Sequence, residues 1–201
     1  MREKKGLIFV ISGPSGSGKT TLIKSLLKDK GLKKILAKSV SFTTRPKRKN
    51  EKDKRDYFFI RREQFDKLLN RKKIIEWTKY LDYYYGTPRD YLDEQLRKGR
   101  HIALCLDTKG AAKIKGVYPG NTVTIFILPP KIEVLRQRMH LRSRKTREKK
   151  LSLRLKLAGK EMSQAGSYDY RIINDEFSTA LNELKEIITA RTERKEQRSS
   201  L

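Results

Sequence analysis

The sequence feature that most constrains the fold is GPSGSGKTT, residues 13–21, which fits the pattern G-x-x-x-x-G-K-[ST]. Before it, Gly6–Ser12 is a short apolar run rich in β-branched residues, as expected of a buried strand. After it, Thr21–Lys28 places apolar residues on one face of a helix. A strand, a glycine-rich loop and a helix in this order predict a loop whose backbone N–H groups surround a phosphate.

The residue types of this loop suit a nucleoside triphosphate. Glycines let successive N–H groups converge on an anion, and the helix adds the positive end of its dipole. Lys19 would reach the β- and γ-phosphates, and the Thr20 hydroxyl would ligate Mg²⁺. A Gly/Ser-rich turn that matches by chance is the alternative, and the flanking strand and helix argue against it. The expected nucleotide contacts are Gly13, Pro14, Ser15, Gly16, Ser17, Gly18, Lys19, Thr20 and Thr21.

Strand-like and helix-like patterns alternate along the rest of the chain. His101–Asp107, Thr122–Leu128 and Tyr170–Asn174 indicate strands, whereas Ile132–Leu141 and Phe177–Ala190 indicate amphipathic helices. Such alternation is typical of an α/β fold in which helices flank a parallel sheet. Ligands of these sheets bind at the carboxyl ends of the strands, which is where residues 13–21 would lie.

Three regions break this pattern. Residues 41–87 combine short strands, aromatic residues and turns, which predicts an inserted subdomain. Arg142–Lys150 is too polar to pack and is predicted to be mobile. The last residues, 191–201, are charged enough to predict a disordered tail.

The net charge of +26 arises from 49 basic and 23 acidic residues. The basic residues are distributed from Arg2 to Arg198, which favours a solvated surface that attracts polyanions non-specifically over a specific nucleic-acid site.

The single cysteine, Cys105, excludes an internal disulfide and suits a reducing cytoplasm. His101 and His140 are far apart in sequence, which disfavours a metal site built on them. No apolar run is long enough to span a membrane, and MREKKG leads into a strand rather than a signal peptide, so we expect a cytoplasmic protein with no membrane partner.

Four further stretches resemble the guanylate kinase family and follow that family's order. They are SFTTRPKRKNEKDKRDYFF (41–59), IIEW (74–77), YYGT (84–87) and IIND (172–175). The resemblance extends from Gly6 to about Ile188. It implies a single domain with the P-loop NTPase fold of nucleoside monophosphate kinases. The implied parts are a core (1–40, 88–135 and 168–195), a GMP-binding subdomain (41–87) and a mobile lid with its flanking helix (136–167).

The family resemblance also implies a reaction, which is Mg²⁺-dependent phosphoryl transfer from ATP to GMP or dGMP in purine nucleotide recycling. The residue chemistry is consistent with it. Arg45 and Arg48 can both fork onto a phosphate, and Glu76 can accept the N1–H and N2–H₂ donors of guanine while repelling the N1 acceptor of adenine. A structural salt bridge is the alternative role for Glu76. The implied GMP contacts are Ser41, Arg45, Arg48, Tyr57, Glu76, Tyr85, Thr87 and Asp107.

The segment from Arg136 to Lys156 holds the expected lid cations. The resemblance assigns Arg142 and Arg154 to catalysis, together with Lys19 and Arg45, because arginines stabilise charge on a transferring phosphoryl group. It assigns Arg138 and Asn174 to the ATP side, although Asn174 would equally serve as a helix cap. Arg144 and Arg147 receive no role. Thr20 and Asp107 are the expected magnesium ligands.

The chain departs from the family pattern at four positions, one of which is Lys109, where the family commonly has glutamine. Cys105 stands where the family usually has the first of two acids, and we interpret it as a buried strand residue with an inert thiol. Asn50 and Lys54 stand where the family usually has glycines, which predicts an altered turn.

Trp77, which follows Glu76 in the stretch IIEW, is predicted to be a core residue.

Two other functions remain open from the sequence. One is a related kinase acting on a sugar phosphate of the ribose 1,5-bisphosphate type, which has no need of a guanine-binding carboxylate. The other is a guanylate-kinase-like domain that binds proteins without catalysis. Lys19 and Thr20 are both retained, which disfavours the second.

Overall fold

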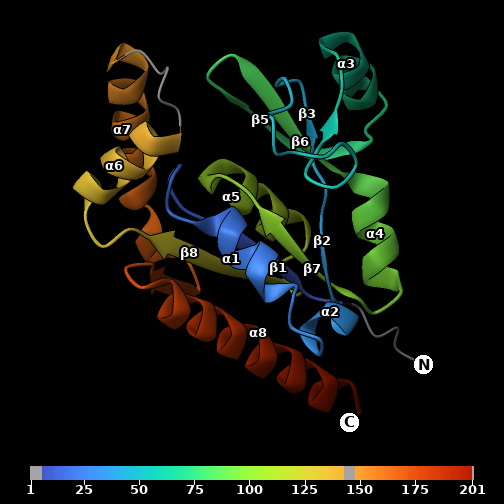
Figure 1. The fold of residues 1–201 in the computed structure, drawn as a ribbon. Helices are drawn as coiled ribbons and strands as arrows, with labels where there is room; N and C mark the ends of the chain where they lie inside the picture. The colour runs from blue at the N-terminus through green and yellow to red at the C-terminus, as the bar shows by residue number, and fades with distance from the viewer. Residues whose placement is uncertain (1–5, 143–147, 201) are drawn as a thin grey trace.

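The structure is a computed structural model that describes residues 6–142 and 148–200. Its larger sheet has five parallel strands in the order β2-β7-β1-β8-β9 (Figure 1). This confirms the predicted α/β fold with a parallel sheet flanked by helices. The strands are β1 (Ile8–Ser12), β2 (Leu36–Lys38), β7 (His101–Cys105), β8 (Thr122–Leu128) and β9 (Tyr170–Ile173).

Eight α-helices occur among the described residues. They are α1 (Lys19–Leu26), α2 (Leu32–Ile35), α3 (Arg62–Asn70), α4 (Arg89–Arg97), α5 (Thr108–Val117), α6 (Ile132–Arg142), α7 (Glu148–Met162) and α8 (Phe177–Ser200). A short 3₁₀ turn, Ala165–Ser167, precedes β9.

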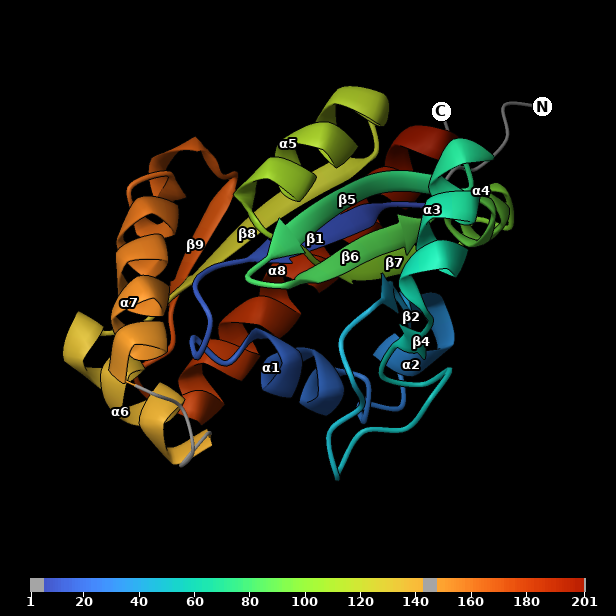
Figure 2. The same cartoon turned by 90° about the horizontal axis from the view of Figure 1, so that it is seen from above.

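Both faces of the larger sheet are covered, as a parallel sheet requires. Phe9 and Ile11 of β1 face α1 and α8, whereas Ile8 and Val10 face α4 and α5. Figure 2 shows α5 on one side of the sheet and α1 and α8 on the other. Every residue of β1 is buried, so the central strand holds the following loop on a rigid base.

The second sheet has four strands in the order β4-β3-β6-β5. β3 (Phe42–Thr43) pairs parallel with β4 (Phe58–Phe59), and β6 (Tyr83–Pro88) pairs antiparallel with β3 and with β5 (Ile74–Tyr80). These strands and α3 come from the segment predicted to be an inserted subdomain. The division of the chain into core, GMP-binding subdomain and lid remains a prediction.

The pair α6 and α7 stands beside the sheet, across from the second sheet (Figure 1). Leu135 and Met139 of α6 pack on Leu151 and Ala158 of α7. The last three residues of the segment Arg142–Lys150 belong to α7, which begins at Glu148, and the mobility of the segment stays a prediction. Its central residues, 143–147, which include Arg144 and Arg147, lie outside the described part of the chain.

The predicted disordered tail is wrong, because α8 continues to Ser200. Ala180, Leu184, Ile188 and Thr192 are all buried. Their spacing of four residues puts them on one face of the helix, so the packed face continues to Thr192, two residues beyond Ala190. The residues that follow are polar but favour helix.

The prediction that Trp77 is a core residue is also wrong, because its side chain is 47% exposed. Side chains alternate between the two faces of β5, so the burial of Glu76 turns Trp77 to the outer face. There its ring lies 5.8 Å from that of Tyr84, whose ring lies 5.7 Å from that of Phe65.

Lys54 adopts the left-handed backbone conformation, with φ of 60°. Its N–H donates to the Tyr57 carbonyl at 2.8 Å, which closes the turn. The chain therefore retains a left-handed residue at one of the two positions where the sequence lacks an expected glycine. Asn50, at the other position, does not have a left-handed backbone conformation.

None of the helices in the described ranges combines the length and the apolar character needed to cross a membrane.

Replacing Ile188 with alanine tests the packing of α8. The side chain is fully buried in the cluster with Leu22 and Ile23 of α1, so we expect the free energy of unfolding to fall by about 2–5 kcal/mol. Arg194→Ala, an exposed position on the same helix, should change it by less than about 0.5 kcal/mol. Guanidinium unfolding curves measure both. Equal stabilities of the two variants would contradict the packing of α8.

Candidate nucleotide-binding site

A cavity of about 880 Å³ opens at the carboxyl end of the larger sheet. Its walls come from the loop after β1, the end of β7, the second sheet and the α6–α7 pair. The parallel strands end at this edge, which is where ligands of such sheets bind. The cavity therefore joins the two groups of residues that the sequence assigned to two nucleotides.

The loop after β1 is fixed by β9. Asn174, at the end of β9, is buried, and its Nδ2 donates to the Ser17 carbonyl at 2.7 Å. A Cβ at Gly18 would lie 2.2 Å from that nitrogen, and the φ of Gly18 is +97°, so only glycine fits here. The amide N–H₂ group of Asn174 therefore holds the loop, a contact that the sequence did not predict.

Lys19 is the first residue of α1, and its side chain lies along the loop. Its Nζ donates to the carbonyls of Gly13 at 2.5 Å and Pro14 at 2.9 Å. Lys19 and Thr20 both line the cavity. The cation is therefore already at the loop, with two carbonyls holding it.

Cys105, at the end of β7, lines the cavity and is only partly buried, which corrects the expectation of a buried strand residue. Burial of the thiol raises its pKa, although Lys19, Lys38 and Thr20 oppose the shift. The thiol is therefore neutral at pH 7, and the neutral thiol is the unreactive form.

Glu76 is the buried acid of the site, with 5% of the residue exposed. Its cross-strand partner on β6 is Thr87, whose hydroxyl donates to Glu76 Oε1 at 2.5 Å. A shift in register between Ile74 and Glu76 turns the carboxylate inward. A Cβ at Gly110 would lie 2.7 Å from Oε2, so a glycine here lets α5 approach the acid.

Burial raises the pKa of Glu76 to about 7, and nearby Asp107 adds to the rise while the bonds from Thr87 oppose it. No ion pair within residues 6–142 and 148–200 reaches this carboxylate. The described contacts therefore do not support a structural salt bridge as the role of Glu76. The acid is held by a hydroxyl and faces the cavity.

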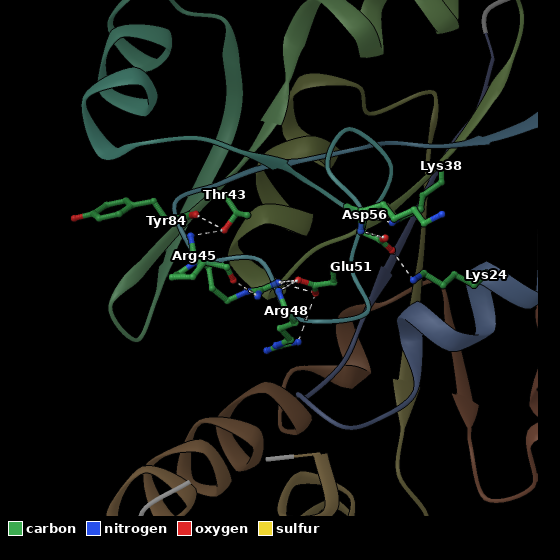
Figure 3. A network of polar contacts seen from close by, with 10 residues as sticks. Lys24, Lys38, Thr43, Arg45, Arg48, Glu51, Asp56 and Tyr84 are labelled. Carbon is green, nitrogen blue, oxygen red and sulfur yellow. Dashed lines mark hydrogen bonds and ion pairs between the residues drawn. The ribbon is translucent and has the colours of Figure 1, made fainter. Parts of the chain in front are cut away.

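Arg45 and Arg48 follow β3, and both line the cavity (Figure 3). Arg45 is 8% exposed; its NH2 contacts both carboxylate oxygens of Glu51, at 2.7 and 2.8 Å, and its NH1 donates to the Pro46 carbonyl at 2.7 Å. The Arg48 backbone N–H donates to Glu51 Oε2 at 3.0 Å. The two predicted phosphate-binding arginines therefore share one acid.

Two tyrosines stand beside Arg45. The Tyr57 and Tyr85 rings are 6.0 Å apart, and the Arg45 guanidinium lies 5.6 Å from the Tyr57 ring. Burial raises the pKa of Tyr57 to about 12, so its phenol keeps its proton and can donate. Ser41 lies on the cavity wall with these residues.

Asp56 links this loop to the phosphate-loop helix. Its Oδ1 lies 2.5 Å from Lys24 Nζ of α1, and its Oδ2 accepts from the Lys52 N–H at 2.9 Å (Figure 3). Burial acts to raise the pKa of Asp56, but the bonds from Lys24 and Lys52 outweigh it and lower the pKa to about 2. The second sheet is thus tied to α1 by a charged contact that persists across the physiological pH range.

The α6–α7 pair places two of the predicted cations. Arg138 lines the cavity, and its NH2 donates to the Asn174 carbonyl at 3.3 Å. Arg154 lies on α7 near Tyr80, and its buried Nε has no hydrogen-bond partner among the described residues. Arg142 ends α6, but its side chain lies outside what the structure describes.

Most predicted site residues meet at this cavity. Pro14, Ser17, Thr87 and Arg154 do not line it, and Ser17 and Thr87 are fully buried. Asp107 lines the cavity and also caps α5, since its Oδ1 accepts from the Gly110 N–H at 2.8 Å.

Sequence reasoning missed several residues of the site. Glu161 of α7 and Tyr80 of β5 line the cavity, and so do Lys24 and Phe177. Burial raises the pKa of Glu161 to about 7, with Lys19 opposing and Asp107 adding to the rise. No motif contains Glu161; the only available signal is an acid on a helix whose other charged residues, apart from Glu148, are basic.

The residues present fit a magnesium ion that arrives with a nucleotide. Among the described residues, no group of three or more His, Cys, Asp or Glu side chains is placed to hold a metal. The cavity wall does offer the Thr20 hydroxyl and the Asp107 carboxylate. Mg²⁺ is commonly bound by one or two such ligands together with phosphate oxygens and water.

Comparisons with known proteins agree on one family. The family model described as Guanylate kinase matches residues 5–191. The guanylate kinase of Rickettsia felis is 42% identical over 193 residues, covering 96% of this chain and 97% of that protein. That of Caldanaerobacter subterraneus subsp. tengcongensis is 40% identical, covering 94% and 89%.

A solved structure extends the agreement to the fold. The crystal structure of guanylate kinase from Anaplasma phagocytophilum matches with a TM-score of 0.78 and 34% identity, covering 96% of this chain and 89% of that one. The P-loop NTPase fold expected from residues 13–21 is thereby confirmed. The chain belongs to the guanylate kinase family.

Proposed function

We propose that this chain transfers the γ-phosphoryl group of ATP to GMP or dGMP, giving ADP and GDP or dGDP. One observation carries the choice of substrate. The buried Glu76 carboxylate faces the same cavity as the Arg45–Arg48 pair and the phosphate loop. A base with two adjacent N–H donors would satisfy the acid, and its phosphate would meet the arginines.

Glu76 would select the base. Within a desolvated site, the N1–H and N2–H₂ groups of guanine give the carboxylate the partners that burial otherwise denies it. Adenine would oppose its N1 lone pair to the same oxygens. The hydroxyls of Ser41 and Thr87 support this end of the cavity, Thr87 by holding Glu76 Oε1.

Arg45, Arg48, Tyr57 and Tyr85 would bind the phosphate of GMP. Arginine forks and phenolic hydroxyls donate to phosphate oxygens, and their fixed positions orient the attacking oxygen. That oxygen would attack the γ-phosphorus of ATP as the bond to the leaving ADP oxygen breaks. Catalysis then consists of positioning and charge stabilisation, with no covalent enzyme intermediate.

The loop from Gly13 to Thr21 would bind ATP phosphates, with Arg138 and Asn174 at the adenine end. Lys19 would exchange its two carbonyl partners for phosphate oxygens, and Arg142 and Arg154 would add charge from α6 and α7. Thr20 and Asp107 would hold Mg²⁺, which neutralises charge on the phosphates when bound.

The two sides of the cavity would close over the substrates. Residues 41–87 would act as the GMP-binding subdomain and 136–167 as the lid, which excludes water and prevents ATP hydrolysis. We assign the enzyme to the cytoplasm. The net charge of +26 would give only non-specific, salt-sensitive contacts with polyanions.

A coupled assay of ADP release over GMP, AMP, UMP, CMP and ribose 1,5-bisphosphate tests the proposal. We expect GMP to be the preferred acceptor. Lys19→Ala should lower kcat by roughly 10²–10³-fold, because it removes a cation from the transferring phosphoryl group. Equal rates with AMP and GMP would refute the specificity for GMP. An unchanged kcat in the Lys19→Ala variant would refute the catalytic role of the loop.

Replacing Glu76 with glutamine tests base recognition. The amide would present an N–H₂ group to the guanine donors, so we expect kcat/KM for GMP to fall roughly 100-fold or more. The KM for ATP should stay within about twofold. Glu183→Gln, on the exposed surface of α8, is the matched control and should behave as the wild type. Unchanged use of GMP by the Glu76→Gln variant would favour a sugar phosphate as acceptor.

The pH dependence of GMP use follows from the raised pKa of Glu76. The carboxylate form accepts from guanine, and with a pKa of about 7 it is lost as the pH falls below 7. We therefore expect kcat/KM for GMP to fall by about tenfold per pH unit below pH 7. Ionisation of the GMP phosphate, near pH 6, affects wild type and Glu76→Gln alike. Identical profiles for the two proteins would contradict the assignment.

A further inference from the structure

Glu51 is the shared anionic partner of Arg45 and Arg48. Its oxygens lie 2.7 and 2.8 Å from Arg45 NH2, Oε2 accepts from the Arg48 N–H at 3.0 Å, and Oε1 lies 3.8 Å from Arg48 NH1. Figure 3 shows the contacts of both arginines converging on this carboxylate. A single acid therefore joins the two cations that the proposed function assigns to the substrate phosphate.

The contact is buried enough to be costly to break. The side chains of Arg45 and Glu51 are 9% and 14% exposed. Burial acts to raise the pKa of Glu51, but the bonds from Arg45 and from the Arg48 N–H outweigh it, and the pKa lies below its usual value. The acid is therefore ionised at neutral pH. Without it, the nearly buried Arg45 guanidinium would lose its charge partner in the loop.

The arrangement leaves donors for a phosphate. A guanidinium carries five N–H donors, and Arg45 directs NH1 to the Pro46 carbonyl and NH2 to Glu51, with Tyr85 as a further partner. Glu51 binds Arg48 through the backbone N–H, whereas the Arg48 side chain is 48% exposed and lines the cavity. The acid thus contacts both residues, while the side chains of Arg45 and Arg48 still line the cavity.

We propose that Glu51 is a positioning residue that holds Arg45 and Arg48 ready for the phosphate of the acceptor nucleotide, and so sets the affinity for that substrate. This inference rests on the proposed function of the two arginines. If Glu51 acted only through its charge, removing it would strengthen the attraction of Arg45 and Arg48 for a phosphate and lower the KM for GMP. If Glu51 positions the two arginines, removing it raises the KM for GMP. The sign of the change in KM therefore distinguishes the two roles.

The test is a set of Glu51 variants, Glu51→Gln, Glu51→Asp and Glu51→Ala, assayed for KM of GMP, KM of ATP and kcat. For Glu51→Gln we expect the KM for GMP to rise about tenfold or more, because a buried, hydrogen-bonded charge loses its partner. The KM for ATP should stay within about twofold. Glu51→Asp should recover part of the loss, and Glu51→Ala should lose most. Glu94→Gln, which breaks an exposed pair with Lys98, is the matched control.

A double-mutant cycle keeps the result interpretable if stability also changes. In an Arg45→Ala background, Glu51→Gln should raise the KM for GMP by less than about twofold further, because the residue to be positioned is absent. Unchanged or lower KM for GMP in Glu51→Gln, or equal effects with and without Arg45, would overturn the inference. Equal increases in the KM for GMP and for ATP would do the same. If the wild type fails to phosphorylate GMP, the proposed function fails instead.

Discussion

The parallel order of the larger sheet is the constraint on which the site depends. Because β1, β7 and β9 run in the same direction, their carboxyl ends bring the phosphate loop, Cys105 and Asn174 to one edge. The bond from Asn174 to the Ser17 carbonyl joins residues 157 positions apart and fixes the loop from behind. The flanking segments then supply what the edge lacks, since the second sheet brings a buried acid and an arginine pair, and α6 and α7 bring cations. A cavity for two nucleotides results from one topological feature.

Three acids of the second sheet show how environment decides the role of a carboxylate. Asp56 and Glu51 are both well buried, yet cations and backbone N–H groups hold their pKa values low. They serve as permanent anions that fix the loop between them. Glu76 is also buried, with 5% of the residue exposed, but its principal partner is the Thr87 hydroxyl, so burial prevails and its pKa rises to about 7. Asp56 and Glu51 hold cations within the protein, whereas Glu76 can still accept hydrogen bonds from the donors of a ligand.

The fold and most of the site could be predicted from the sequence, because both depend on local patterns. Apolar runs gave the strands of the larger sheet, and Gly13–Thr20 fits a motif in which each residue type has a reason. The failures concern tertiary context. The exposure of Trp77 depends on the direction in which a register shift turns β5, and the length of α8 depends on a buried row that ends at Thr192. Glu51 and Glu161 were missed because isolated acids in basic segments carry no pattern, and only the folded chain shows which cations they face.

Cys105 illustrates why one departure from a family pattern has a local effect only. Its thiol lines the cavity, but burial keeps it neutral, so it contributes no charge where the family usually has an acid. Two acids, Asp107 and Glu161, line the cavity at this edge, and Glu161 interacts with Lys19. Asp107 is fixed by the Gly110 N–H, and Gly110 in turn approaches Glu76, so the start of α5 connects Asp107 to the buried acid Glu76. These contacts do not involve the Cys105 thiol.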